Sequence, residues 1–191
     1  ANILKLLEDK YQITEEDFLS AELEIVPAGK AKNSGIDSSM IMAYGQDDRV
    51  CAYTSLAAML EVEDPERTTC CLLVDKEEIG SVGATGMQSR FFENVTAEVM
   101  ERTGKYSELL LRRCLANSSM LSSDVSAAFD PLFAGSFEKK NAAYFGRGMV
   151  FNKFTGARGK SGSNDANAEY FEMLLHFMDD AGVAFQTCLL Y

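Results

Sequence analysis

Residues 68–81, TTCCLLVDKEEIGS, decide the fold and hold the strongest candidate site. The first half, Thr68–Val74, is a short continuous apolar run, which is typical of a strand buried on both faces of a sheet. An acidic turn, Asp75–Ser81, follows directly. Its adjacent glutamates, Glu77 and Glu78, would leave the strand in different directions, so one can ligate a metal ion while the other accepts a proton. A turn whose acidic side chains are only solvated is the alternative.

Helical and extended patterns alternate on both sides of this run. Asp47 and Asp48 precede a helical pattern, and acidic side chains are favourable at a helix N-terminus. A polar, glycine-containing stretch, residues 28–38, predicts a linker or a domain crossing. Helices are predicted over residues 3–9, 50–60, 91–100, 106–115 and 166–178, and strands over 18–27, 68–74, 118–122, 144–154 and 183–190. This alternation predicts an α/β fold, a layered sheet with helices on both faces.

Three acidic positions fall at consecutive junctions between predicted strands and helices: Asp47–Asp48, Glu77–Glu78 and Asp124. In an α/β sheet, sites form at the carboxyl ends of strands, so we expect these side chains in one crevice. Each position taken alone is more often a helix cap or a solvated turn. Gathered together, the carboxylates would repel one another unless a divalent cation neutralised them, and the sequence therefore predicts a metal site.

The composition narrows the classes of function. The 191 residues fit one sizeable α/β domain or a domain with an appendage. With 18 basic and 29 acidic residues the formal charge is −11, which argues against nucleic-acid binding. The apolar runs are too short to span a membrane, and the charged amphipathic start is unlike a signal peptide. Five cysteines without CxxC spacing predict free thiols in a reducing cytoplasm.

A single histidine, His176, limits the chemistry further. It lies in a predicted helix beside Leu175 and Phe177, where a packing or surface role is expected rather than metal binding. A mechanism that needs two or three imidazoles cannot be completed by this chain alone.

Basic residues near the glycine-rich segment 155–163 are candidates for binding substrate. This segment lacks the GxxxxGK[ST] spacing of a nucleotide P-loop, so nucleotide binding is not expected. Lys153 and Lys160 are placed as candidate substrate-binding residues. An exposed, solvated loop is the alternative.

Four segments carry a resemblance to a known family. They are YGQDDRVCAYTSL (residues 44–56), LLVDKEEIGSVGATGMQS (72–89), SSMLSSDVSAAFDP (118–131) and TGARGKSGSNDANAE (155–169). In this order and spacing they resemble the aspartyl aminopeptidases, and the fourth resembles the bacterial branch. The resemblance runs from about Phe18 onward. It implies a cytoplasmic, di-metal exopeptidase whose catalytic domain has the α/β fold of metal-dependent exopeptidases and is interrupted by an inserted domain.

The resemblance also implies a role for each acidic position. The aspartate matching Asp47 bridges two metal ions, expected to be zinc. Glu78 ligates one ion and Asp124 the other, while Glu77 is the general base. The family uses two histidine ligands as well, one in an upstream His-x-Asp segment and one near the carboxyl terminus. Neither has a counterpart in this sequence, so both are expected outside this chain.

The same comparison implies a fragment. Residues 1–31 resemble the tail of an inserted lid or dimerisation domain, and residues 32–191 resemble part of the catalytic domain. We therefore expect an aminopeptidase that removes the amino-terminal residue of peptides, assembles into a large closed homo-oligomer, has no nucleic-acid or membrane partner, and is inactive as this fragment alone. The alternatives are a non-catalytic subunit or scaffold with structural carboxylates, and a carboxylate-only magnesium or manganese hydrolase acting on phosphate esters.

Overall fold

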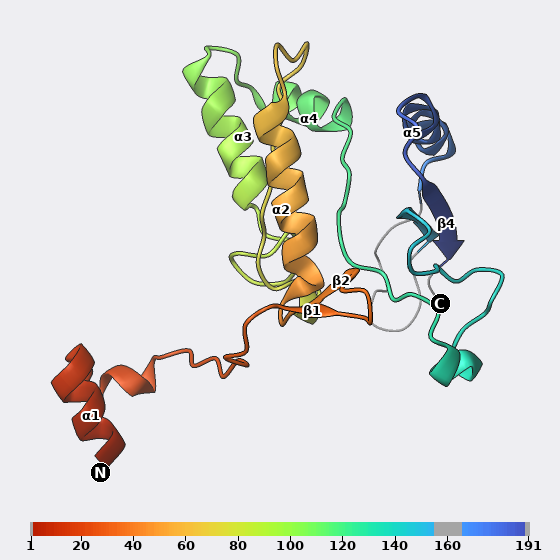
Figure 1. The fold of residues 1–191 in the computed structure, drawn as a ribbon. Helices are drawn as coiled ribbons and strands as arrows, with labels where there is room; N and C mark the ends of the chain where they lie inside the picture. The colour runs from red at the N-terminus through yellow and green to blue at the C-terminus, as the bar shows by residue number, and fades with distance from the viewer. Residues whose placement is uncertain (1, 155–165, 190–191) are drawn as a thin grey trace. The chain divides into compact units, whose positions relative to one another are not determined.

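The computed structural model describes residues 2–154 and 166–189. The chain divides into two compact units, Ala1–Gln46 and Asp47–Tyr191. Figure 1 shows the elements in chain order. Among the described residues, the longest and most apolar helices still fall short of what crossing a membrane requires. The predicted boundary at residue 31 concerns an inserted domain, which contacts within this chain do not test, so it stays a prediction.

The first unit holds a helix and a short hairpin. Helix α1 (Asn2–Tyr11) confirms the helix predicted from apolar spacing near the start of the chain. Strands β1 (Lys32–Ser34) and β2 (Met40–Met42) pair antiparallel. Gly35, with a φ of 86°, supplies the left-handed conformation that the connecting turn needs. Part of the predicted linker over 28–38 is therefore a hairpin strand.

The strand predicted over residues 18–27 is wrong. The segment begins in a 3₁₀ turn, η1 (Asp17–Leu19), where the Asp17 carboxylate accepts hydrogen bonds from the Thr14 amide and hydroxyl at 2.7 and 2.8 Å. The apolar side chains that gave the alternating pattern are exposed, with Ile25 100% accessible. Alternation alone does not make a strand, because a strand needs a neighbour for its backbone hydrogen bonds.

The helices predicted from residue 47 onward are confirmed. They are α2 (Gln46–Glu61), α3 (Phe91–Arg102), α4 (Glu108–Ala116) and α5 (Ala168–Asp180). Ser107 caps α4 by accepting a hydrogen bond from the Leu110 amide at 3.2 Å. Asn167 caps α5 in the same way, accepting from the Tyr170 amide at 2.8 Å.

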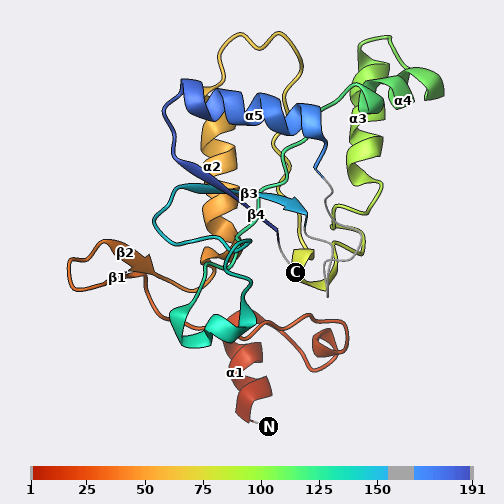
Figure 2. The ribbon, with the colours of Figure 1, turned by 90° about the vertical axis from the view of Figure 1, so that its right-hand side faces the viewer.

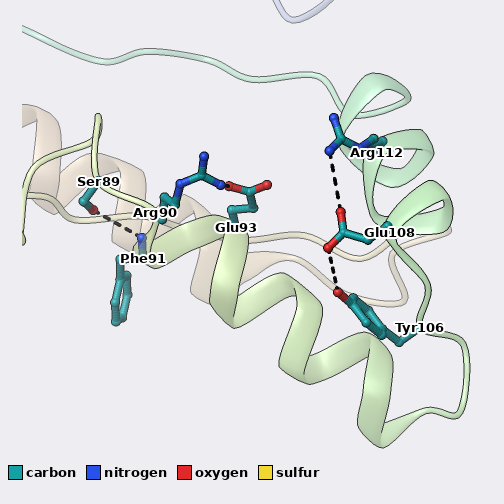
Figure 3. A network of polar contacts seen from close by, with 7 residues as sticks. All are labelled: Ser89, Arg90, Phe91, Glu93, Tyr106, Glu108 and Arg112. Carbon is teal, nitrogen blue, oxygen red and sulfur yellow. Dashed lines mark hydrogen bonds and ion pairs between the residues drawn. The ribbon is translucent and has the colours of Figure 1, made fainter.

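Polar contacts line the surfaces of α3 and α4 (Figure 3). Arg90 lies 2.9 Å from Glu93 at the start of α3. Glu108 accepts a hydrogen bond from the Tyr106 hydroxyl at 3.2 Å and lies 3.6 Å from Arg112, one turn further along α4. Because these side chains are exposed, the pairs orient the ends of the helices and contribute little to stability.

A parallel strand pair confirms the α/β class. Strands β3 (Met149–Phe154) and β4 (Phe185–Leu189) lie side by side, and α5 connects them (Figure 2). The Phe151 ring packs edge-on against Phe171 of α5 and Phe185 of β4, with centroid distances of 5.6 and 6.0 Å. These contacts join the helix to the sheet, as in a βαβ unit.

A side-chain clamp fixes the loop that leads into β3. Gln186 on β4 accepts a hydrogen bond from the Tyr144 amide at 2.8 Å and donates one to the Tyr144 carbonyl at 2.9 Å. Gly148 has a φ of 89° and lies against the Ala184 carbonyl, where a Cβ atom would overlap. The extended structure predicted over 144–154 therefore becomes a turn followed by a strand.

The strands predicted over 68–74 and 118–122 are not formed. Neither run pairs in a ladder within the described part of the chain. Leu73 is 59% exposed, so the apolar run is not covered on both faces. The Arg67 guanidinium donates a hydrogen bond to the Asn117 carbonyl, which places the starts of the two runs next to each other. The physical reason for the error is that an apolar run becomes a strand only when a neighbouring strand pairs with it.

Candidate metal centre

The first two carboxylates lie at the start of α2. Asp47 (φ −85°, ψ 108°) and Asp48 (φ −117°, ψ 19°) have non-helical backbone angles although they are in the first turn. Their side chains are therefore at the positive end of the helix dipole, where negative charge is favourable. Asp47 is exposed and Asp48 is half-buried.

The third carboxylate comes from a distant segment without regular secondary structure. Asp124 follows the run 118–122, and its Oδ1 accepts a hydrogen bond from the Val125 amide at 2.7 Å. Carboxylate oxygens of Asp47, Asp48 and Asp124 all lie within 4.8 Å of one another. The structure thus brings together two of the predicted metal ligands, Asp47 and Asp124, and adds Asp48.

The sequence places Asp48 in the same crevice but gives a ligand role to Asp47 alone. The structure keeps Asp48 at the helix N-terminus and also turns its side chain toward Asp124. The signal was present in the DD pair that begins α2. The doublet alone does not say which of its two side chains faces the site, and here both do.

The two glutamates lie in a short 3₁₀ turn, η2 (Glu77–Ile79). Glu77 is half-buried, and its negative charge acts on Asp48. Glu78 is exposed and is outside the group of oxygens that converge within 4.8 Å. Of the two side chains, it is the expected base, Glu77, whose charge acts on the aspartates, whereas the expected ligand, Glu78, is outside the converging group. The assignment of Glu78 as a metal ligand stays a prediction.

Backbone hydrogen bonds close the loop that carries these glutamates. The Ser81 amide donates to the Lys76 carbonyl at 2.8 Å, and the Gly80 carbonyl accepts from Gln88 Nε2 at 2.6 Å. Gly86 is buried against the Ser81 carbonyl, with no room for a Cβ atom. The loop over residues 80–86 is thus an ordered turn that fixes η2.

Burial and mutual repulsion shape the electrostatics of the cluster. Desolvation raises the pKa of the Asp48 carboxyl above its ordinary value of 3.8, and the charges of Asp124, Asp47 and Glu77 raise it further. A hydrogen bond from the Cys51 thiol acts in the opposite direction. Burial raises the pKa of that thiol to about 11, so it is neutral near pH 7. These carboxylates stay ionised together most easily when a cation lies among them.

The donor set fits a divalent cation. Asp48 Oδ1 is buried and has no hydrogen-bond partner within the described residues, so it is an acceptor available to an ion. The three converging groups supply oxygen ligands, which suit hard cations and also occur in mixed zinc sites. His176 contributes nothing here, since it is an exposed residue of α5 lying 3.8 Å from Glu172.

The predicted substrate-binding lysines are not tested by this geometry. Lys153 is an exposed residue in the last part of β3. Lys160 lies outside the described residues. A cavity of about 250 Å³ lies beside residues 72–75 and 84–92, and it is mostly apolar. Asp75 is the acidic residue at its edge, and the aspartate cluster does not line it.

Comparison with known proteins assigns the chain to a family. The family described as aminopeptidase I zinc metalloprotease (M18) matches residues 1–190. The chain belongs to the M18 aminopeptidase family. The resemblance seen in the sequence is therefore confirmed at the level of the family.

Bacterial M18 relatives match nearly the whole chain. A probable M18 family aminopeptidase 1 from Clostridium acetobutylicum is 61% identical over 186 residues, covering 97% of this chain and 40% of the relative. The crystal structure of aminopeptidase I from that organism covers 98% of this chain and 40% of its own, with a TM-score of 0.86 at 60% identity. An M18 family aminopeptidase from Thermotoga maritima gives a TM-score of 0.90 at 42% identity, covering 99% of this chain and 42% of that one.

This M18 chain spans about two fifths of the length of these relatives. Its α/β fold is that of M18 aminopeptidase structures over the part that aligns.

Proposed function

We propose that the complete protein is a metal-dependent aminopeptidase that hydrolyses the amino-terminal residue of peptides. The observation that carries this proposal is the convergence of Asp47, Asp48 and Asp124 within 4.8 Å, from two segments far apart in the sequence. Membership of a family described as zinc metalloproteases supports zinc as the cation. The family resemblance further supports a cytoplasmic homo-oligomer, and the five free thiols agree with a reducing compartment.

Two zinc ions are proposed, and the residues of this chain that would hold them are Asp47, which would serve both ions, and Glu78 and Asp124, which would each serve one. Two further histidine ligands are expected from the rest of the protein. Bound divalent cations supply Lewis acidity, which makes water more acidic and a peptide carbonyl more electrophilic. The carboxylates of this chain hold the cations and orient the amino-terminal end of the substrate against them.

Glu77 is proposed as the general base. It is half-buried on a turn fixed by backbone hydrogen bonds, and its charge acts on Asp48 of the cluster. In this role its carboxylate accepts a proton from the attacking water and then passes it to the leaving amine. A base that is not a metal ligand can be replaced without emptying the metal site.

The test compares Glu77→Gln and Glu78→Ala in the complete protein. Hydrolysis of aminoacyl-anilides and metal content by elemental analysis are measured together. Glu77→Gln should lower kcat by about 10²–10⁴-fold and keep its metal, because the amide cannot accept the proton. Glu78→Ala should lose metal as well as activity. Glu61→Gln, an exposed change at the end of α2, is the matched control and should behave as wild type.

Each contrary outcome has a meaning. If Glu77→Gln empties the site, the roles of the two glutamates are reversed. If wild-type protein binds magnesium or manganese in preference to zinc and hydrolyses phosphate esters, the carboxylate-only hydrolase is correct. If it binds metal but hydrolyses neither class of substrate, the carboxylates belong to a non-catalytic subunit.

A further inference from the structure

The loop that precedes β3 is fixed in place by its own side chains. This loop, residues 131–147, begins with the turn η3 (Pro131–Ser136). The Phe129 ring, just before the loop, lies 5.3 Å from the Tyr144 ring near its end, measured between ring centres. The Tyr144 hydroxyl donates a hydrogen bond to the Lys139 carbonyl at 3.1 Å. These contacts join the two ends of the loop, so its surface is preorganised for binding.

The same loop is positively charged on a negatively charged chain, and it is called the basic loop below. Its three basic residues and one acidic residue give it a formal charge of +2, whereas the whole chain has −11. The basic residues are Lys139, Lys140 and Arg147, and all three are exposed. The Arg147 guanidinium lies 4.6 Å from the centre of the Tyr144 ring, which holds the cation at the surface without neutralising it.

Large apolar side chains lie among these charges. Leu132 is 88% exposed, Phe133 65% and Phe145 75%. Exposed aromatic residues on a rigid support, with charged residues around them, are typical of a protein–protein interface. The basic loop therefore fits an acidic protein surface that has apolar residues of its own.

The outer face of α5 has both of these properties. The helix contains four acidic residues and no lysine or arginine. Residues at helical spacing form its exposed face, called the acidic face below: Glu169, Glu172, Met173, His176, Phe177 and Asp180. Phe177 is 58% exposed, so apolar surface lies between the charges. The acidic face thus complements the basic loop in charge and in apolar character.

The two surfaces lie on opposite sides of the β3–β4 pair. The Phe151 ring packs against Phe171 of α5 and against Phe185, so α5 covers this face of the strands. Gln186 follows Phe185 in the strand and points to the other face, where it holds Tyr144 of the basic loop. Figure 2 shows α5 above the two strands and the turn η3 below them. Because the strands separate them, the basic loop and the acidic face cannot meet within one copy.

We propose that the basic loop of one copy binds the acidic face of α5 on a second copy of the complete protein. The contact is head-to-tail, because it joins two different surfaces. Each copy therefore keeps one surface of each kind free, and the contact can repeat until a ring closes. The inference rests on the proposed homo-oligomer in one respect, namely that copies of the complete protein associate, and it adds which surfaces meet.

The test reverses charges in the complete protein and measures assembly by sedimentation velocity over a range of concentrations. The loop variant is Lys139→Glu with Lys140→Glu, and the helix variant is Glu172→Lys with Asp180→Lys. Each should raise the dissociation constant of the contact roughly tenfold or more, because like charges then face each other. A chain that carries all four changes should assemble more tightly than either variant, because the attraction returns with its signs exchanged.

Controls separate this contact from general effects of charge and stability. Arg102→Glu with Lys105→Glu makes the same change of charge at exposed positions around the end of α3, and it should assemble as wild type does. Phe133→Ser removes an exposed apolar side chain and should also weaken assembly. Added salt should weaken assembly of the wild-type protein, because it screens exposed charges. Thermal unfolding, zinc content and hydrolysis of aminoacyl-anilides are measured for every variant.

Three results would overturn the inference alone. Loop and helix variants that assemble as tightly as wild type would show that these surfaces form no contact between copies. Variants that lose thermal stability but keep wild-type assembly would show that the loop binds another part of its own chain. A chain with all four changes that assembles no better than either variant would show that the two surfaces do not meet each other.

Failure of the proposed function gives different results. Monomeric wild-type protein would overturn the proposed homo-oligomer and this contact together. Wild-type protein that assembles but cleaves no peptide would overturn the proposed activity, and the comparison of assembly among the variants would remain valid.

Discussion

Replacing Asp48 by asparagine removes one of three negative charges that the fold holds within 4.8 Å. The amide keeps the approximate shape of the side chain and removes its charge. In the metal-free protein, the change should therefore increase the free energy of unfolding. In the zinc-bound protein, it should weaken the attraction for the cation. These opposite effects follow from the same charge.

The magnitude follows from Coulomb's law. Two unit charges 4.8 Å apart repel by about 0.9 kcal/mol in a water-like dielectric and by about 3.5 kcal/mol at an effective dielectric constant of 20. Asp47 and Asp124 are exposed, so the lower value applies to each pair. Two pairs give a gain of about 2 kcal/mol for metal-free Asp48→Asn at low salt. A divalent cation at a similar separation would lose about twice the single-pair energy, about 2 kcal/mol, so zinc should bind roughly 20–30-fold more weakly.

The increase in the free energy of unfolding caused by Asp48→Asn should be larger at higher pH. The pKa of Asp48 is raised in the folded protein above its ordinary value of 3.8. The folded state therefore holds this proton more tightly than the unfolded state, and the contribution of Asp48 to stability falls as pH rises through the window above 3.8. The advantage of Asp48→Asn should vanish below pH 3.8 and be complete at neutral pH.

The assay is urea unfolding of chelator-treated protein at several pH values and two salt concentrations. Asp64→Asn removes an exposed charge from a turn outside the cluster and serves as the matched control. Salt should reduce the gain, because it screens exposed charges. If Asp48→Asn is less stable than wild type at neutral pH without metal, Asp48 makes a net favourable contact and the account of repulsion is wrong.

Two further predictions concern the loops around the site. Gly86→Ala should destabilise the protein by about 1–3 kcal/mol and lower zinc affinity, since the new Cβ would overlap the Ser81 carbonyl and move the turn that carries the proposed ligand Glu78. The control is Gly135→Ala, where the new Cβ meets open space. Thermal unfolding and zinc titration are measured for both variants, and equal stability and equal zinc affinity would contradict this prediction. Gln186→Leu should cost about 1–3 kcal/mol by leaving the Tyr144 amide and carbonyl unpaired. Gln186→Glu keeps the acceptor and should lose less in urea unfolding, and equal losses would show that the clamp does not stabilise the loop.

The helices were predictable because their signals are local. Apolar spacing and capping residues such as Ser107 and Asn167 determine where a helix begins, whatever packs against it. The boundaries of α4 and α5 follow these residues closely. β4 was also predictable, since it follows a helix and pairs in parallel with β3.

The strand over 68–74 could not be predicted in the same way. Its apolar run satisfies the composition of a buried strand, but pairing depends on a neighbour that the run itself does not specify. Leu73 is exposed in the described structure, and the run lies beside an apolar cavity instead of a second strand. The local pattern therefore indicated that the segment is apolar, but it did not indicate which strand, if any, would pair with it.

The candidate site shows the same division between local and distant information. The charged motifs indicated Asp47 and Asp124 as members of one site, and their side chains do converge. Asp48 received no ligand role from the sequence, because the direction of its side chain depends on backbone angles that depart from the helix at both aspartates.

The cluster also links folding to cation binding. Holding three carboxylates within 4.8 Å destabilises the metal-free fold, since the unfolded chain separates the same charges. A divalent cation that binds the folded state removes this repulsion and stabilises the protein by mass action. The segments that carry Asp47 and Asp124 should therefore be held together more firmly when a cation lies among their carboxylates than in the metal-free protein.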